Sequence, residues 1–160
     1  MDWQIESGIR TAVFLSATSS DMGEYRRRTS DILIQAGIFP VVQDYFGSDY
    51  RTIEEMLFEK IYSSDAVICI VGHLFGASPT LNGLASDRSY TQMEFDMAVR
   101  LEKPIYLFIA NDNLKTDNRV IESEELQLKQ YEFRTTIFAD TRKYQMFSSL
   151  SDLELLIHGL

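Results

Sequence analysis

Four short apolar runs recur along the chain, at residues 11–15, 38–42, 66–71 and 104–110. Each run is rich in β-branched or aromatic side chains, and none alternates cleanly between apolar and polar positions. Uninterrupted apolar runs of this length are typical of strands that are buried on both faces of a parallel sheet. The pattern therefore predicts four buried strands.

The first two stretches between these runs have the spacing of amphipathic helices. Residues 21–35 precede Gly37, a residue type that commonly ends helices. Residues 52–62 carry apolar side chains at helical spacing, and Thr52 and Glu55 at their start have the capping-box arrangement. Both stretches are predicted to be helices.

A third helix is predicted to begin after Ser89, which forms a second capping box with Gln92. It is expected to end before Pro104, because proline disfavours helix in the residue that precedes it. These bounds place Glu94 in the first turn of the helix. The apolar stripe of this helix consists of Met93, Met97, Ala98 and Leu101.

The last third of the chain has a weaker pattern. Residues 122–133 are predicted to be helical and residues 135–138 to form a fifth strand. A closing helix is predicted over residues 149–157, with Ser149 or Ser151 as its cap.

This order of strands and helices predicts an α/β fold, a doubly wound parallel sheet of about five strands with helices on both faces. The polar stretches 76–88 and 111–119 are expected to be surface loops. A chain of 160 residues with 45% hydrophobic residues fits one domain with a full-sized core.

The net charge is −9, from 24 acidic and 15 basic residues, and it disfavours nucleic-acid and anionic-membrane partners. Residues 1–10 lack a signal-peptide pattern, and no apolar stretch reaches the roughly 18 residues of a membrane span. A cytoplasmic protein is expected. Cys69 is the single cysteine, lies within an apolar run and is predicted to be a buried, inert thiol.

Hydroxyl side chains gather after the first predicted strand. Ser16, Thr18 and Asp21 belong to this cluster, which could present hydroxyls and backbone amides to a ribose or a phosphate. Alternatively, the two serines at positions 19 and 20 or Asp21 only cap the following helix. No glycine-rich fingerprint is present, which argues against a tightly held redox dinucleotide or a nucleoside triphosphate.

Two further loops fall at the same predicted edge of the sheet. Tyr45 and Phe46 lie in an aromatic loop at residues 43–51, where they could stack on a base or a nicotinamide ring or could anchor the loop to the core. His73 follows the third strand, and a role in ligand contact or capping is expected for it. No metal site is predicted, because no second histidine or carboxylate stands at ligand spacing.

Glu94 is the strongest catalytic candidate, because it opens a helix beside the end of an apolar strand. The alternative is structural, since an acidic residue in the first turn of a helix is favoured by the helix dipole.

These motifs resemble the Toll/interleukin-1 receptor (TIR) superfamily, especially its bacterial TIR-like branch, which often heads larger signalling and defence ATPases. The resemblance runs from residue 13 to about residue 156. Its carriers are Val-Phe-Leu-Ser at 13–16 followed by Asp21, Ile-Tyr-Ser-Ser-Asp-Ala-Val-Ile at 61–68, and Ser-Tyr-Thr-Gln-Met-Glu-Phe at 89–95 followed by Lys-Pro-Ile at 103–105.

In catalytic TIR domains, the glutamate of an aromatic-x-x-x-Glu motif splits NAD into nicotinamide and an ADP-ribose product. Tyr90 and Glu94 match that motif, although Tyr90 replaces the more usual Trp, Thr91 takes a place often held by Cys, and Ser89 stands one residue closer to the glutamate than in many relatives. The resemblance implies a flavodoxin-like TIR domain over residues 1–160, either complete or at the N-terminus of a larger protein. It also implies NAD as substrate, no separate cofactor, and self-association in antiviral defence signalling.

Two other functions remain open. Many TIR relatives are non-catalytic interaction modules that dock identical domains or partners. The nucleoside deoxyribosyltransferases are similar α/β enzymes that also use a glutamate ahead of a Lys-Pro strand, but they normally need an acidic residue that recognises the base, and no clear candidate for that residue is present.

Overall fold

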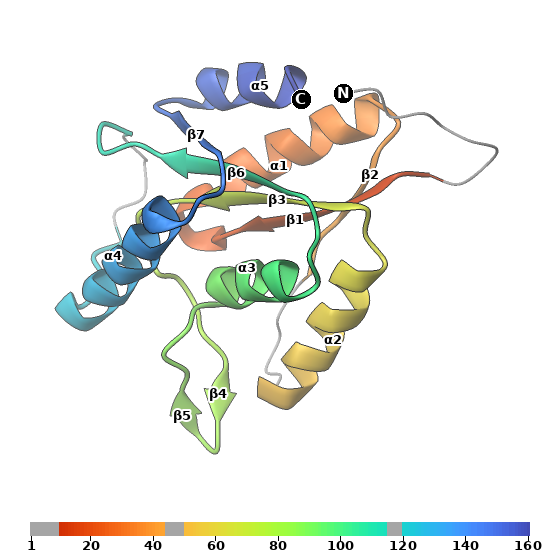
Figure 1. Ribbon diagram of the computed structural model, residues 1–160. Coiled ribbons are helices and arrows are strands. Elements are labelled where there is room, and N and C mark those ends of the chain that lie inside the picture. The colour runs from red at the N-terminus through yellow and green to blue at the C-terminus, as the bar shows by residue number, and fades with distance from the viewer. Residues whose placement is uncertain (1–9, 44–49, 115–119) are drawn as a thin grey trace.

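The computed structural model describes residues 10–43, 50–114 and 120–160, except for the side chains of Ser19 and Tyr50. Within these residues, five strands form one fully parallel sheet, with the order β2-β1-β3-β6-β7 (Figure 1). The order is that of flavodoxin-like folds, so the predicted fold class is confirmed. The strands are β1 (Ala12–Ala17), β2 (Phe39–Val41), β3 (Ala66–Val71), β6 (Ile105–Ala110) and β7 (Tyr144–Phe147).

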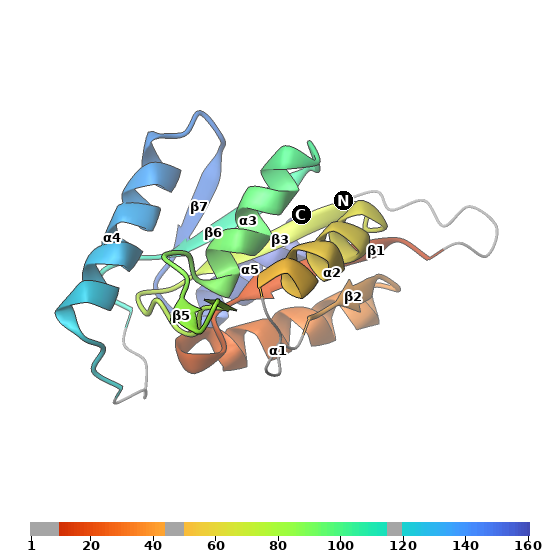
Figure 2. The same cartoon turned by 90° about the horizontal axis from the view of Figure 1, so that it is seen from below.

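Helices cover both faces of this sheet, as Figures 1 and 2 show. On one face lie α1 and α5, and on the other lie α2, α3 and α4. The helices are α1 (Ser19–Gln35), α2 (Tyr50–Tyr62), α3 (Tyr90–Arg100), α4 (Glu124–Ala139) and α5 (Leu150–His158). In the described part of the chain, no helix is both long and apolar enough to cross a membrane.

Successive residues of β1 belong to different cores. Val13 and Leu15 pack on the side of α1 and α5, whereas Phe14 packs with Leu57 of α2 and Met93 of α3. Because both faces of the strand are covered, both sets of side chains are apolar. This explains why the strand sequence shows no alternation.

The prediction of a strand at residues 135–138 is wrong. These residues belong to α4, where Phe133 and Ile137 are four positions apart and pack side by side against the sheet. The fifth strand is β7, in which three of four residues are exposed and only Phe147 is buried. A strand with so little buried surface leaves no apolar run in the sequence.

Helix starts follow the predicted caps in two cases. Ser89 accepts a hydrogen bond from the backbone N–H of Gln92, and Ser149 accepts one from that of Asp152. Thr52 is not the cap of α2, because the helix already begins at Tyr50. Thr18 is the N-cap residue of α1, so the serines at 19 and 20 and Asp21 lie inside the helix.

The predicted loop 76–88 contains a small antiparallel hairpin, β4 (Thr80–Leu81) and β5 (Leu84–Ala85). Asn82 and Gly83 connect its strands, and both have positive φ values, 53° and 79°. Two such residues make the type I′ turn that an Asn-Gly pair favours. The Asn-Gly pair was therefore a sequence signal for this hairpin.

The chain changes direction at the carboxyl ends of β1 and β3. From β1 it crosses by α1 to β2, and from β3 it crosses by α3 to β6, on the other face and in the other direction. Ligands of doubly wound proteins bind at such a switch point. Ser16 and Cys69 are paired in register there.

Candidate functional site

Glu94 lies at this switch point, under the end of β1. The residue is only 4% exposed, and Ser16 donates a hydrogen bond from Oγ to Glu94 Oε1 at 2.7 Å. Ser16 is itself buried and faces α3, since it alternates with residues that face α1. A buried carboxylate is unfavourable unless it is hydrogen-bonded, so Ser16 helps to keep Glu94 in this place.

The prediction that Glu94 lies in the first turn of its helix is wrong. Because α3 begins at Tyr90, Glu94 is the fifth helical residue, and the first turn contains no acidic residue. Interaction with the helix dipole falls off within the first turn and does not account for this carboxylate. Stabilisation of the helix dipole is therefore not the reason for an acidic residue at this position. A structural role for Glu94 would have to come from contacts such as the one with Ser16 of β1.

Cys69 contacts Ser16 and lies within the electrostatic influence of Glu94. Its thiol lies 3.9 Å from Ser16 Oγ and is fully buried, as the sequence predicts. Burial, and after it the nearby charge of Glu94, raises the pKa of Cys69 to about 12. A thiol with that pKa stays protonated at neutral pH and is not a nucleophile.

A second contact between α1 and α3 lies beside the first. The hydroxyls of Thr18 and Thr91 are 3.0 Å apart, and both residues are buried. Thr18 starts α1 and Thr91 is in the first turn of α3, so the two helix starts are held together above the sheet edge. Thr91 is thus a site residue that sequence reasoning did not select.

Tyr90 is half-buried and packs against the core formed by Phe14, Leu57 and Met93. Its backbone N–H donates to Ala77 O at 3.1 Å, which ties the hairpin segment to the start of α3. Burial raises the pKa of the Tyr90 phenol above its ordinary value. The predicted aromatic residues Tyr45 and Phe46 lie outside the described residues.

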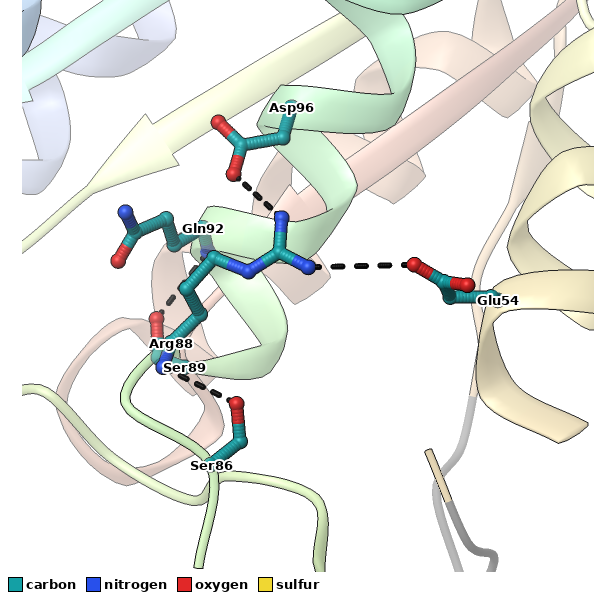
Figure 3. A network of polar contacts seen from close by, with 6 residues as sticks. All are labelled: Glu54, Ser86, Arg88, Ser89, Gln92 and Asp96. Atoms are coloured by element: carbon teal, nitrogen blue, oxygen red, sulfur yellow. Dashed lines mark hydrogen bonds and ion pairs between the residues drawn. The ribbon is translucent and has the colours of Figure 1, made fainter. Parts of the chain in front are cut away.

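Arg88 fixes the segment that leads into α3 (Figure 3). Its guanidinium pairs with Asp96 of α3 at 2.8 Å and approaches Glu54 of α2 at 3.9 Å, while its backbone N–H donates to Ser86 Oγ at 3.1 Å. These groups are partly exposed, so each ion pair contributes modestly. Together they place Ser89, the next residue, where it caps the helix that carries Glu94.

Asp21 and His73 form a second group of predicted residues, around the loop after β3. Asp21 Oδ2 accepts hydrogen bonds from the backbone N–H groups of His73 and Leu74, and His73 Nε2 is 2.8 Å from Asn111 O. Burial raises the pKa of Asp21, and these amide hydrogen bonds oppose the rise. Asp21 therefore does not cap its own helix but holds a neighbouring loop.

Three further residues hold the same loop, and sequence reasoning did not select them. Glu122 accepts hydrogen bonds from the backbone N–H groups of Phe75 and Gly76. Gln130 donates to Gly72 O, and Arg134 donates to Gly72 O and to Ala110 O at 3.0 and 2.7 Å. Gly72 and Gly76, four residues apart, were the sequence signal that something approaches this backbone closely.

The structure thus brings Ser16, Thr18 and Glu94 together where β1 ends and α3 begins. Thr18 also contacts the loop bound by Asp21, because a Cβ at Gly76 would meet the Thr18 methyl group. The two groups of predicted residues are therefore adjacent parts of one edge.

Comparison with solved structures supports the fold assignment. The chain is similar to the TIR domains in the structure of the activated Roq1 resistosome that directly recognizes the pathogen effector XopQ, with a TM-score of 0.56. The match covers 93% of this chain and 98% of the other, at 13% sequence identity. A similarity at this identity shows a TIR-like fold.

Comparison by sequence gives a family. No curated protein matches the chain significantly. Residues 12–158 match DUF4062, which is described as a domain of unknown function. The match spans nearly the whole sheet and its helices, and the chain therefore belongs to the DUF4062 family.

Proposed function

We propose that this protein hydrolyses NAD at the bond between nicotinamide and ribose, with Glu94 as the catalytic carboxylate. The observation that carries the proposal is the place of Glu94, a buried carboxylate that Ser16 holds at the switch point of a doubly wound sheet. The TIR-like fold and the Tyr90/Glu94 spacing support the same reaction.

The chemistry of NAD suits a site with a single carboxylate. The bond from ribose C1′ to the pyridinium nitrogen breaks, its electron pair stays on nitrogen, and nicotinamide leaves as a neutral ring. No general acid is needed to protonate the leaving group. Glu94 would stabilise the oxocarbenium-like ribose or attack C1′ from the opposite face, and water then adds at C1′ and releases a proton.

Ser16 would act as the positioning residue of this reaction. Its hydrogen bond fixes one oxygen of Glu94 and so limits rotation of the carboxylate. Thr18, Asp21, His73 and Tyr90 lie on the same edge and are proposed to contact the substrate. Tyr45 and Phe46, which lie outside the described residues, are proposed to contact it as well.

Access to Glu94 is the main constraint on this function. Because Glu94 is only 4% exposed, substrate reaches the carboxylate only after neighbouring segments move. We infer that self-association drives that opening, and the origin of the similar TIR domains in an activated resistosome supports this inference. Activity would then depend on protein concentration.

The test is the release of nicotinamide from NAD at low and high protein concentration. Wild type is expected to show release that rises more steeply than linearly with concentration, and Glu94→Gln to show none. The matched control is Glu154→Gln, because Glu154 pairs with Arg28 on the opposite face of the sheet. Circular dichroism verifies that each variant is folded.

The burial of Glu94 favours a second candidate function, that of a non-catalytic interaction module. If folded wild type releases no nicotinamide, even when fused to an oligomerising tag, the NAD hydrolase proposal fails and the protein is an interaction module. Release of a free base from deoxynucleosides but not from NAD would instead indicate a deoxyribosyltransferase-like enzyme.

A further inference from the structure

Two carboxylates from distant parts of the chain occupy the loop after β3. The N–H groups of His73 and Leu74 donate to Asp21 Oδ2 at 2.9 and 3.0 Å. Those of Phe75 and Gly76 donate to the two oxygens of Glu122 at 2.8 and 2.9 Å. Four consecutive amides therefore point at anionic groups, and successive amides of this kind form concave sites that bind phosphate.

Glycine at both ends allows this loop to approach other groups closely. Gly76 has a φ of +73°, and a Cβ there would collide with the methyl group of Thr18. A Cβ at Gly72 would collide with the carboxylate of Asp21. In this loop, hereafter the amide loop (residues 72–76), position 76 therefore requires glycine for its conformation and for space, and position 72 for space alone.

The amide loop lies beside the helix that carries Glu94. Gly76 packs against Thr18, and the Thr18 hydroxyl contacts that of Thr91. The next loop residue, Ala77, accepts a hydrogen bond from the backbone N–H of Tyr90. Thr91 and Tyr90 form the first turn of α3, and Glu94 follows one turn later. A ligand on the amide loop would therefore be adjacent to the proposed reaction centre.

One oxygen of the two carboxylates that hold the amide loop has no hydrogen-bond partner in the part of the chain that the structure describes. Asp21 is 8% exposed, and its Oδ1 atom is the one buried side-chain nitrogen or oxygen without a hydrogen-bond partner among the described residues. A buried carboxylate oxygen without a donor is unfavourable. A hydroxyl group of a ligand would supply the missing donor.

The geometry points to a binding site for the ribose-phosphate part of a nucleotide, with Glu122 as a built-in competitor for the phosphate. A ribose hydroxyl donates to Asp21 Oδ1, and phosphate oxygens accept from the N–H groups of Phe75 and Gly76. Glu122 must then leave, because its negative charge and the phosphate compete for the same two amides. The choice of an NAD-derived nucleotide rests on the proposed function, but binding is measurable without turnover.

Binding of two probes, ADP-ribose and inorganic pyrophosphate, tests this site by calorimetry on the full chain. Glu122→Gln is expected to bind both probes about tenfold more tightly. The neutral side chain binds the N–H groups of Phe75 and Gly76 less strongly than Glu122 does, so a larger fraction of the protein has these amides free for the probe. Glu124→Gln is the matched control, since it removes the same charge two residues away from an exposed position, and it should bind like wild type. Asp21→Asn should weaken ADP-ribose binding and leave pyrophosphate binding unchanged.

Unchanged or weaker binding of both probes to folded Glu122→Gln would overturn the proposal and make the carboxylate a structural link. If that variant does not fold, amide chemical shifts of the wild type decide: those of Phe75 and Gly76 must move as ADP-ribose saturates the protein. No movement of these amides overturns the proposal. Binding with this pattern but without nicotinamide release would support the site and contradict only the hydrolase function.

Discussion

Ser16 and Glu94 are 78 residues apart in the chain, and their side chains are joined by a buried hydrogen bond of 2.7 Å. Ser16 is the penultimate residue of β1, and Glu94 lies in the second turn of α3. The bond joins β1 to α3 at the switch point, and it therefore fixes the orientation of the candidate catalytic carboxylate relative to the sheet.

Replacing Ser16 by Ala should lower kcat for nicotinamide release by about tenfold with little change in KM, since the carboxylate remains but is less well oriented. Loss of a donor to a buried carboxylate should also lower the free energy of unfolding by about 1–3 kcal/mol. Kinetics and urea unfolding measure the two effects. Ser63→Ala removes an exposed hydroxyl at the end of α2 and should change neither quantity. Full activity in Ser16→Ala would contradict the positioning role.

Gly76 and Gly83 allow a matched comparison of backbone strain. Both have positive φ values, +73° and +79°, but only at Gly76 would a new Cβ meet another residue, Thr18. Gly83→Ala should reduce the free energy of unfolding by about 1–2 kcal/mol, the cost of a left-handed conformation for alanine. Gly76→Ala should reduce it by about 1–3 kcal/mol more, because of the steric conflict. Equal losses in urea unfolding would show that the amide loop yields to the added methyl group.

Arg134 is 9% exposed and donates hydrogen bonds to two backbone carbonyls, those of Gly72 and Ala110. We expect Arg134→Met to reduce the free energy of unfolding by about 2–4 kcal/mol, because it removes charged donors from buried carbonyls. Arg142→Met is the control: Arg142 forms a partly exposed pair with Asp140, and its loss should be worth less than about 1 kcal/mol. Similar losses for the two variants in chemical unfolding would refute a structural role for Arg134 in the amide loop.

The sequence contained the local signals of this fold but not its long-range pairings. The apolar runs and the Ser89 cap were readable because burial on both faces and helix capping depend on neighbouring residues. Residues 135–138 were misread because their β-branched and aromatic side chains suit a strand, whereas packing of Phe133 and Ile137 on the sheet makes them helical. Tertiary packing there overrides local propensity.

The candidate site shows the same division. Ser16 and Glu94 could be selected because both stand next to the ends of predicted strands at one sheet edge. Glu122 could not be selected, because its partners are backbone amides 46 and 47 positions away. Every residue except proline has a backbone N–H, so the sequence does not show which of these groups bind a side chain. Asp21 was correctly predicted to lie at this edge of the sheet. Its hydrogen bonds to the amide loop could be identified only from the folded structure.

The pH dependence of stability tests the environment of Asp21. Burial raises its pKa in the folded protein, so the folded state binds the proton more tightly than the unfolded state. The stability that Asp21 contributes is therefore fully present below the ordinary aspartate pKa of about 3.9 and is lost as the pH rises through the raised value. Asp21→Asn should accordingly be less destabilising at pH 7 than at pH 4 in urea unfolding.

Asp152 provides a control of opposite sign. Hydrogen bonds from the backbone N–H and the hydroxyl of Ser148 lower the pKa of Asp152. Its contribution is present above the ordinary pKa and is lost as the pH falls through the lowered value, so Asp152→Asn should be more destabilising at neutral pH than in acid. The same pH trend for both variants would contradict the assigned environments.

Cys69 can report the opening of the site that catalysis requires. Its thiol is fully buried, its pKa is raised to about 12, and it lies next to Ser16 and Glu94. At pH 8, alkylation by iodoacetamide should be much slower in the native protein than in urea, because the reagent cannot reach the buried thiol and the raised pKa keeps that thiol protonated. Mass spectrometry of timed samples measures both rates.

If self-association opens the site, native alkylation of Cys69 should accelerate at the protein concentrations where nicotinamide release appears. Glu94→Gln should still show this acceleration, because the variant removes the reacting charge but not the assembly surface. An alkylation rate that is independent of concentration while turnover rises would separate assembly from opening, and the substrate would then have to reach Glu94 by a movement that leaves Cys69 covered.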